Sequence, residues 1–522
     1  MPSPLFARKP LEVLLAELKG EDRLRRILGP VQLSGLGVGA IIGTGIFVLT
    51  GVGAQKAGPA LILSFVVSGL ACVFAALCYA EFASMVPVAG SAYTYAYATL
   101  GELLAWIIGW DLVLEYTVTS ATVAHGWSHY FQEFIGIFGL AIPKSLSIAP
   151  FAYGGGGAAA TGAYADLPAI LITIVVAAVL VKGIRESASV NAAVVGLKLA
   201  VVLFVVVVGA FLVRPENWAP FAPHGYAGFA FFGKFPFGPI DEHGHPLGML
   251  AGAAIIFFSY IGFDSVSTHA EEARRPQRDV PIGIISSLLI CTVLYIAVTV
   301  VLTGMVPYGQ IDVHAPVSAA FRQAGLPWAQ FLISLGALAG ITSVLLVMML
   351  SQPRVLLAMA RDRLLPPSFF GAVHPKFRTP WKTTILTGAV VAAMGGFLPL
   401  EILADLANIG TLLAFVIVCA AVLVMRRTHP KAERPFRAPL FPATPILGIA
   451  TCLLLMFSLP AENWLRLLAW LVVGFLVYFG YSRRHSALRR AAREAAGAAP
   501  AADAAPPAAG APASALEGLE EP

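Results

Sequence analysis

Charge is scarce in this sequence. Asp, Glu, Lys and Arg make up only 12% of its 522 residues, whereas hydrophobic residues make up 58% and the mean hydropathy is +0.80. A soluble globular domain carries about 25% charged residues, so the composition excludes that class of protein. The net charge of +5 is small for so long a chain. It gives no reason to expect a nucleic-acid partner.

Cysteine is rare, and the sequence does not begin like a signal peptide. Residues 1–28 are charged and amphipathic, and they contain neither a short apolar core nor a small-residue cleavage site. We therefore expect them to form a cytoplasmic amphipathic N-terminus. An odd number of cysteines, all within apolar runs, favours free thiols over a disulfide framework. The five are Cys72, Cys78, Cys291, Cys419 and Cys452.

The sequence does contain many apolar runs that are long enough to cross a bilayer, which takes about 20 residues. They predict an all-α polytopic membrane protein with one transmembrane domain over residues 29–482. The tail, residues 483–522, begins basic and becomes rich in Ala and Pro, so we expect it to be disordered. The twelve predicted spans are 31–55, 60–85, 101–134, 167–182, 188–213, 247–271, 281–306, 327–360, 382–399, 402–426, 441–460 and 463–482.

The positive residues are unevenly distributed between the spans. If the N-terminus is cytoplasmic, 27 of the 34 Lys and Arg residues fall on the cytoplasmic side, 6 fall outside, and Lys198 lies within a span. Loops of membrane proteins carry their excess of Lys and Arg on the cytoplasmic side. We therefore expect a multi-pass protein of the cell (inner) membrane with both termini in the cytoplasm.

The first span contains more glycine than a simple membrane helix should. Each of its five glycines (35, 37, 39, 43 and 45) costs about 1 kcal/mol relative to alanine inside a helix. Gly35, Gly39 and Gly43 repeat every four residues, which is typical of a small-residue packing face. That face does not account for the stretch Gly43-Thr44-Gly45 near the middle of the bilayer. We predict a discontinuous helix there, because non-helical backbone is tolerated at that depth where it lines a cavity or is buried in protein.

A break of this kind can bind both ends of a zwitterion. Free amide groups at the start of the second half-helix attract an anion, and carbonyl groups at the end of the first half-helix suit an ammonium group. Folds of this type place a second break in an inverted repeat. The sixth span, GAAIIFFSYIGFDSVSTHAEE, is indeed interrupted at Gly262 and Asp264. Asp264 is either an N-cap of the second half-helix or a residue that contacts substrate.

Five long motifs resemble the amino acid–polyamine–organocation (APC) superfamily of transporters, and in particular bacterial relatives of the cationic amino acid transporters. They occur in family order and cover almost the whole transmembrane region. The resemblance implies inverted repeats of five spans each, at about 31–213 and 247–426, followed by two extra helices within 441–482. The motifs are GVGAIIGTGIFVLTG (37–51), PVAGSAYTYAYATLGELLAWIIGWDLVLEY (87–116), FFSYIGFDSVSTHAEEARRPQRDVPIGI (257–284), SQPRVLLAMARDRLLP (351–366) and ANIGTLLAF (407–415).

The resemblance also implies a substrate site. The backbone at Thr44 and Gly45, next to Gly43, would bind the carboxylate of an amino acid. Ile341 in the eighth span would line the side-chain pocket, where an aliphatic residue restricts the substrate to a small neutral amino acid such as alanine. The substrate amine would meet the carbonyl groups of Ile41, Phe258, Ser259 and Ile261.

Lys198 lies about ten residues into the fifth span, or roughly 15 Å deep at 1.5 Å per residue. A lysine side chain of roughly 6 Å cannot reach the interface from that depth. A charged lysine is costly there, so we expect Lys198 either to have a partner or to be neutral. In sodium-coupled relatives a cation lies between the first and eighth spans. The resemblance implies that the ammonium group of Lys198 takes its place, near first-span carbonyls and a hydroxyl such as that of Ser343, and couples transport to protons.

The third span carries further ionisable residues. Asp111 and Glu115 share one helix face at i, i+4 spacing. Glu115 is either a second proton-coupling residue or a buried, hydrogen-bonded carboxylate that holds helices together. His125, His129 and Glu133 form a stripe with a possible metal spacing, but they lack the H-E-x-x-H pattern and lie at the outer membrane edge. We therefore predict no metal site there.

Three positions depart from the family pattern. Small residues usually stand where this sequence has His269, and glycine usually stands at Ser351 and Arg363. Protonation of His269 could affect gating. Alternatively, His269 is a solvated polar residue near the exit.

These observations favour a secondary active transporter that imports small neutral L-amino acids with protons, works as a monomer and needs no cofactor. Its other partners are protons and membrane lipid. The alternative is a proton-independent exchanger of cationic amino acids or polyamines. An enzyme is disfavoured because the sequence offers no nucleophile, base or metal at catalytic spacing. A channel is disfavoured because paired breaks at the midplane favour occluded binding over an open pore.

Overall fold

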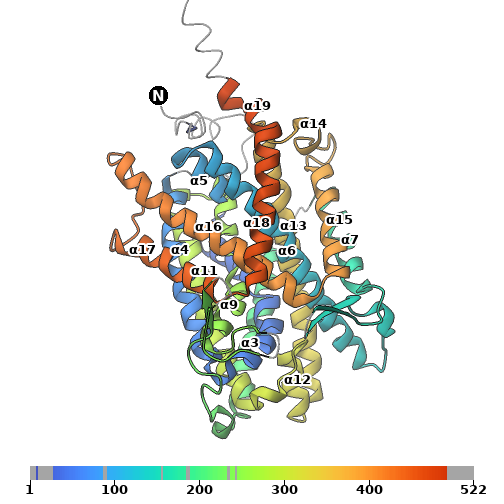
Figure 1. Cartoon of the computed structure of the whole chain (residues 1–522). Helices are drawn as coiled ribbons and strands as arrows, with labels where there is room; N and C mark the ends of the chain where they lie inside the picture. The colour runs from blue at the N-terminus through green and yellow to red at the C-terminus, as the bar shows by residue number, and fades with distance from the viewer. Residues whose placement is uncertain are drawn as a thin grey trace, which may run out of the picture.

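The computed structural model describes residues 8–9, 28–85, 91–154, 157–183, 188–231, 235–241 and 244–490. They form a bundle of long helices with two short hairpins (Figure 1). The helices are α2 (Pro30–Ile41), α3 (Thr50–Ala57), α4 (Leu61–Met85), α5 (Ser91–Thr99), α6 (Glu102–Gly136), α7 (Leu167–Lys182), α8 (Ala188–Ala210), α9 (Met249–Ile256), α10 (Ser265–Thr268), α11 (Pro276–Met305), α12 (Pro316–Gln323), α13 (Pro327–Arg361), α14 (Pro367–Phe370), α15 (Trp381–Phe397), α16 (Leu400–Thr428), α17 (Ala443–Phe457), α18 (Ala461–Val477) and α19 (Arg483–His485). The hairpins pair β1 (Phe151–Gly154) with β2 (Gly157–Ala160) and β3 (Phe229–Phe231) with β4 (Phe235–Phe237), both antiparallel.

The helices confirm the polytopic membrane class. In the described residues, eight helical stretches are long and apolar enough to cross a membrane, and three shorter apolar helices accompany them. Each of the twelve predicted spans coincides with one helix or with a broken pair of helices. Twelve crossings and the five-plus-five repeat stay predictions. The predicted N-terminal segment and tail lie largely outside the described residues, which include only residues 8–9 and 28 of the former and 483–490 of the latter.

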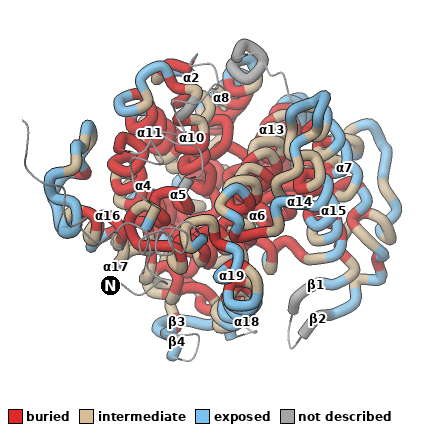
Figure 2. Tube along the Cα trace, turned by 90° about the horizontal axis from the view of Figure 1, so that it is seen from above, coloured by how far each residue is buried: buried red, intermediate tan, exposed pale blue. Residues whose placement is uncertain are grey.

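The centre of the bundle is packed by helices that are distant in sequence. Helix α6 lies against α13 and α16, while α11 lies against α4 and α2. Buried residues fill the middle of the bundle and exposed ones lie at its periphery (Figure 2). Many exposed side chains on α7 and α18 are large and apolar, including Leu171, Val175, Leu468 and Leu476. Apolar exposure of this kind fits contact with lipid tails. All five cysteines are buried and free, as predicted.

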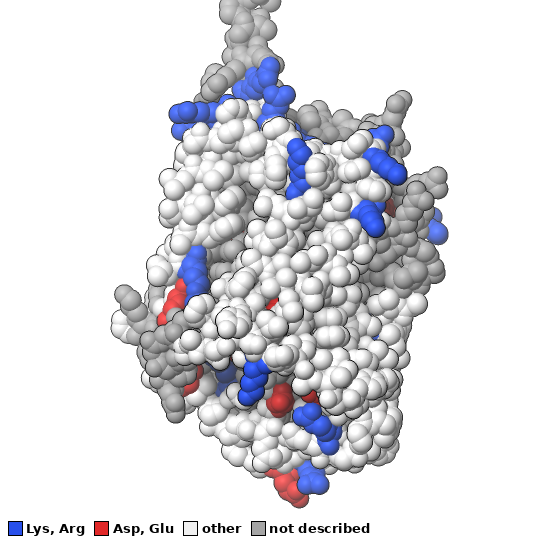
Figure 3. Space-filling model, turned by 90° about the vertical axis from the view of Figure 1, so that its right-hand side faces the viewer, with Lys and Arg blue, Asp and Glu red and all other residues white. Residues whose placement is uncertain are grey.

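The two described terminal segments meet at one end of the bundle, which we call the terminal face (Figure 1). There Lys9 Nζ lies 3.0 Å from Asp362 Oδ1, and Arg489 Nε donates to Glu102 Oε1 at 2.8 Å. The opposite end, which carries α12, is the distal face. On the side drawn in Figure 3, Lys and Arg gather at the terminal face, charges of both signs mark the distal face, and most of the surface between is uncharged.

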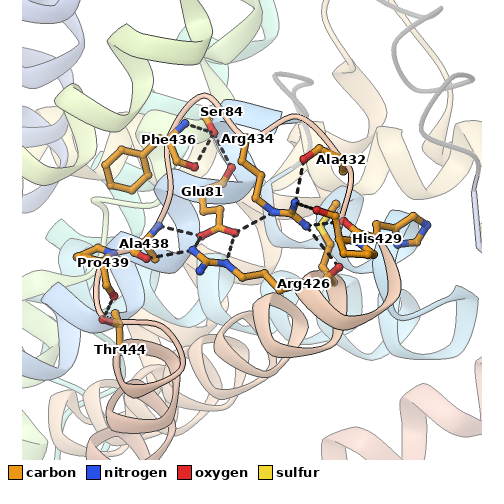
Figure 4. A network of polar contacts seen from close by, with 12 residues as sticks. Glu81, Ser84, Arg426, His429, Ala432, Arg434, Phe436, Ala438, Pro439 and Thr444 are labelled. Carbon is orange, nitrogen blue, oxygen red and sulfur yellow. Dashed lines mark hydrogen bonds and ion pairs between the residues drawn. The ribbon is translucent and has the colours of Figure 1, made fainter.

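A carboxylate at the end of α4 organises the terminal face (Figure 4). Glu81 accepts hydrogen bonds from Arg426 Nε (2.9 Å) and Nη2 (2.5 Å) and from the backbone amide of Ala438 (2.8 Å). Arg434 Nε completes the network at 3.4 Å. Glu81 is 2% exposed, so its charge is matched by arginine rather than by water. The network ties α4 to the end of α16 and to the loop that follows it.

Candidate functional site

The first predicted span is broken where its glycines concentrate. Helix α2 ends at Ile41, and Ile42 leaves the helical region with ψ 105°. After Gly43 the chain resumes at Thr44 and forms a π-helical turn over Gly45–Leu49 before continuing into α3. The first amide groups of a helix have no acceptor within it. Those at Thr44 and Gly45 are therefore free to bind an anion.

The sixth predicted span is broken as well. Helix α9 passes into a 3-10 turn over Phe257–Tyr260, and the chain is extended at Ile261 with ψ 131°. Gly262 then has φ +122°, a value that favours glycine. A Cβ atom at Gly262 would also lie 2.9 Å from the Ala40 carbonyl oxygen. The predicted break is confirmed, and it lies directly against the end of α2.

The two breaks pack against each other because glycine leaves room. A Cβ atom at Gly45 would lie 2.3 Å from Ser259 Cα, and one at Gly43 would lie 2.7 Å from Val344 Cγ2 on α13. The backbone around Ser259 cannot move away easily, so Gly45 has no substitute. The predicted carboxylate-binding segment thus faces the second break and the middle of α13.

Two buried hydroxyl groups at this junction lack partners. Thr44 Oγ1 and Ser259 Oγ have no hydrogen-bond partner in the described part of the chain. Among the predicted amine-binding carbonyls, Ile41 already accepts a hydrogen bond from Tyr295 (2.8 Å) and Phe258 accepts one from the Ile261 amide (3.1 Å). A carbonyl oxygen has two lone pairs, so each can still accept a bond from an ammonium group.

Helix α13 covers one side of the junction with an apolar face. Ile341 is fully buried and lies one turn before Val344, the residue that contacts Gly43. Residues three apart share a helix face. Ile341 therefore belongs to the surface that α13 presents toward the first break.

Lys198 reaches the first break from α8. Its side chain is completely buried, and Nζ donates to the carbonyl groups of Gly39 (2.5 Å) and Ile42 (3.0 Å). Its aliphatic part lies beside α13, 3.4 Å from where a Cβ atom at Gly340 would stand. Ser343 makes no hydrogen bond to Lys198 among the described residues, so the contact with the eighth span is made at Gly340 instead. The lysine joins α2, α8 and α13.

Three carboxylates are buried on the other side of the junction. Tyr116 donates to Asp264 Oδ2 at 3.0 Å. In the described residues the second oxygen of Asp264 and both oxygens of Asp111 and Glu115 have no hydrogen-bond partner. Asp264 does occupy the N-cap position of α10, but its side chain makes no capping hydrogen bond of normal geometry there. Glu115 approaches the Thr411 hydroxyl group of α16 without a hydrogen bond of normal geometry, so both alternatives for this carboxylate stay predictions.

The histidine stripe of α6 separates into three different contacts. His125 Nδ1 lies 3.2 Å from Asp166 Oδ2 and 3.2 Å from the Gly395 carbonyl oxygen. His129 stacks on His314, and Glu133 pairs with Arg322 at 2.6 Å. The described residues contain no cluster of three metal-ligating side chains.

The departures from the family pattern have local explanations. His269 ends α10, and its Nδ1 lies 3.0 Å from the Ser265 carbonyl oxygen. Arg363 has φ +59°, the conformation that glycine adopts most easily. Ser351 bonds back to the Val347 carbonyl oxygen at 2.9 Å. In the described part of the chain, none of these three side chains makes a hydrogen bond to the contact between the two breaks.

Sequence reasoning missed two residues that support the breaks. Asn408 Nδ2 donates to the carbonyl groups of Ala254 (2.9 Å) and Ile255 (3.1 Å), which end α9. The Tyr295 hydroxyl group donates to the carbonyl oxygen of Ile41, the last residue of α2, at 2.8 Å. The motif ANIGT around Asn408 was a signal, because a buried amide in an apolar span needs acceptors. Nothing in the local sequence indicates which carbonyls it meets.

Comparison with known proteins identifies the family of this chain. Residues 28–478 match the sequence profile of the family described as amino acid permease. The methylthioribose transporter of Bacillus subtilis (strain 168) is 46% identical over 94% of this chain and 100% of its own length. The branched-chain amino acid permease BcaP of the same organism has the same identity and coverage. The vacuolar cationic amino acid transporter 4 of Arabidopsis thaliana is 39% identical over 82% of this chain and 68% of its own length. The chain therefore belongs to the amino acid permease family of APC-superfamily transporters.

Proposed function

We propose that this protein is a secondary active transporter that carries small neutral L-amino acids, such as alanine, into the cell together with protons. The observation that carries the proposal is the contact between two broken helices, next to a buried lysine that binds one of them. The break in the first span offers free amide groups on one side and carbonyl oxygens on the other. A zwitterion has the matching pair of charges.

Substrate recognition would rest mainly on backbone. The carboxylate binds the amides of Thr44 and Gly45, where the positive end of the half-helix favours an anion. The ammonium group binds carbonyls at the ends of α2 and of the Phe257–Tyr260 turn. Thr44 Oγ1 and Ser259 Oγ, both buried without partners, gain hydrogen bonds from the ligand. Leaving them unsatisfied costs about 1–3 kcal/mol each, so substrate binding relieves a penalty.

Substrate size would be set by α13. Ile341 is aliphatic and fully buried, so it offers neither space nor a charged partner for a long cationic side chain. The relative named for branched-chain amino acids is consistent with an apolar pocket.

Coupling would be performed by Lys198. When protonated, its ammonium group bridges the carbonyls of Gly39 and Ile42 and holds α2 against α8 and α13. When Lys198 loses its proton, the amine donates fewer and weaker hydrogen bonds. The end of α2 is then released, and the transporter turns inward with its substrate. Glu115, which is buried and has no hydrogen bond of normal geometry in the described residues, is a second group that would bind a proton during the cycle.

We place the terminal face in the cytoplasm of a cell whose inner membrane the protein crosses as a monomer. The concentration of Lys and Arg at that face supports this orientation (Figure 3). In this orientation α2 and α10 are the cytoplasmic halves of the two broken helices.

The alternative function is proton-independent exchange of cationic amino acids or polyamines. The relatives named as cationic amino acid transporters favour it. Such a substrate needs an acidic partner for its side chain, and Glu115 and Asp264 are the buried candidates near the junction.

Uptake by purified protein in liposomes separates these functions. With an inward proton gradient we expect alanine to accumulate inside empty liposomes, and an inward sodium gradient should add nothing. Arginine and ethylamine should inhibit alanine uptake only weakly. The side chain of arginine is too long for the pocket, and ethylamine lacks the carboxylate. Uptake that requires preloaded substrate and ignores the proton gradient would establish exchange and overturn the proposal. Preferential uptake of methylthioribose would reassign the substrate.

A further inference from the structure

A cavity lies toward the distal face, and the residues that line it differ from those at the contact between the two breaks. Its volume is about 440 Å³, within the range of roughly 300–1,000 Å³ that is typical of small-molecule sites. Leu49 and Ile255 contribute apolar side chains to its wall. These residues belong to the distal halves of the two broken helices. The cavity therefore lies on the distal side of the proposed central site.

The cavity wall carries charges of both signs. Lys56, at the end of α3, and Arg466, on α18, supply positive charge. Four carboxylates line the cavity as well, those of Asp241, Glu401, Asp405 and Glu462. Asp405, on α16, interacts electrostatically with both cations. Lys56 has no hydrogen-bond partner for its ammonium group among the described residues, so that group is available to a ligand.

One neutral side chain in the wall is buried and incompletely satisfied. Asn463 is 1% exposed, and its Oδ1 accepts a hydrogen bond from Arg466 Nη1 at 2.9 Å. Its Nδ2 approaches Asp405 but makes no hydrogen bond of normal geometry in the described part of the chain. A buried amide N–H without an acceptor is unfavourable. A ligand with a carboxylate oxygen would remove that penalty.

Helix α18 supplies two polar side chains to the cavity wall. It lies outside the two predicted repeats, and in the described residues it packs mainly against α16 and α6. Its first two turns nevertheless supply both Asn463 and Arg466 to the cavity. This gives one of the two extra helices a ligand-binding role.

We propose that this cavity is an outer binding site for a free amino acid, which holds the zwitterion before it enters the central site. The substrate ammonium group pairs with Asp405, and its carboxylate binds Lys56 and the Asn463 amide. The apolar side chain of the ligand rests on Leu49 and Ile255. The inference depends on the proposed function for its ligand class, but it concerns a separate set of residues.

Equilibrium binding of radiolabelled alanine to the purified full-length protein tests the outer site. The parent protein should bind two molecules per chain. Gly45→Leu, which fills the central site, should bind one. Asn463→Leu and the double variant Lys56→Gln/Asp405→Asn should each weaken the remaining site by about tenfold or more, as the loss of one charge-assisted contact predicts. Arg214→Gln, an exposed change elsewhere, is the matched control and should bind as the parent does.

The outcomes separate the outer site from the proposed function. One molecule per chain in the parent, and none in Gly45→Leu, overturns the outer site and leaves the proposed function intact. No binding of any amino acid by the parent overturns both. The elution volume and thermal stability of each outer-site variant are compared with those of the parent, and binding is scored for the folded variants. Unchanged binding to folded Asn463→Leu and to the folded double variant would also overturn the outer site.

Discussion

At the scale of single residues, Lys198 combines complete burial with a bond to the broken end of α2. Its ammonium group replaces the hydrogen bonds that the Gly39 and Ile42 carbonyls lose at the end of a helix. We predict that Lys198→Met abolishes proton-driven accumulation of alanine while substrate binding persists, because methionine keeps much of the volume but carries no titrating charge. Accumulation is measured as alanine uptake into liposomes with an imposed proton gradient, and substrate binding is measured at equilibrium on the same protein.

Two results would remove Lys198 from the coupling mechanism. One is undiminished proton-driven uptake by Lys198→Met. The other is sodium-dependent uptake by the parent protein, since a bound sodium ion and the lysine ammonium group would compete for the same carbonyls.

Ile341 tests the specificity part of the proposal. Ile341→Ser removes about three carbon atoms from a fully buried position, so the side-chain pocket gains both space and a polar group. We predict that arginine becomes a competitor of alanine uptake, with an inhibition constant at least about tenfold lower than for the parent. Ile333→Ser, also on α13 and fully buried, is a control for general loosening of the helix. Equal affinity of the parent for alanine and arginine would contradict the assignment.

Asp166 provides a pH-dependent prediction. It is the N-cap of α7, outside the spanning segment, and accepts hydrogen bonds from the Ala169 amide (3.1 Å) and Ser128 Oγ (2.5 Å). Burial raises the pKa of its carboxyl group from 3.8 to about 7. The folded chain therefore holds a proton that the unfolded chain releases, so folded-state stability falls as pH rises from about 4 to about 7.

The measurement is the melting temperature in detergent at pH 5 and pH 8. The parent should lose more stability between these values than Asp166→Asn, whose side chain does not titrate. An equal loss in both proteins would show that Asp166 is ionised throughout.

At the scale of elements, the pair of broken helices is a single unit. Each break is buried against the other, so their backbone groups are either paired across the contact or left for a ligand. Gly45→Leu places a bulky side chain where even a Cβ atom would lie 2.3 Å from Ser259 Cα. We predict complete loss of central-site binding and uptake, with membrane insertion retained because the apolar length of the span is unchanged.

Membrane insertion and binding can be measured on the same preparation. The control is Gly35→Leu, because the position of its Cβ atom has no neighbour within 4 Å. A Gly45→Leu protein that still transports alanine would contradict the broken-helix site.

At the scale of the whole molecule, the terminal segments hold the terminal face together. Fully buried Glu102, at the start of α6, accepts bonds from Tyr97, Tyr478, Ser486 and Arg489. We predict that Arg489→Gln lowers the free energy of unfolding by about 3 kcal/mol, because it leaves a buried carboxylate without its cation. Arg484→Gln, a change at an exposed arginine five residues earlier, should have little effect. Equal thermal stability of the two variants would contradict the role of this contact.

The linear sequence determined the features that depend on local pattern. Apolar run length predicted the helices, and glycine concentrated at Gly43 and Gly45 predicted the first break, since glycine is costly in a continuous helix. The position of Gly262 predicted the second break in the same way. The odd, apolar set of cysteines predicted free thiols. These inferences succeed because the bilayer restricts the chain to helices that satisfy their own backbone.

Only the tertiary structure decided which groups meet across the bundle. Lys198 is 159 positions from Gly39, and Asn408 is 154 from Ala254. The Asp264 side chain accepts a hydrogen bond from Tyr116 on α6 rather than from its own helix. The three residues of the histidine stripe have different partners because α7, α12 and α15 lie beside different parts of α6. Spacing along one helix shows which side chains share a face, but the neighbouring helix that covers that face is chosen by packing of the whole bundle.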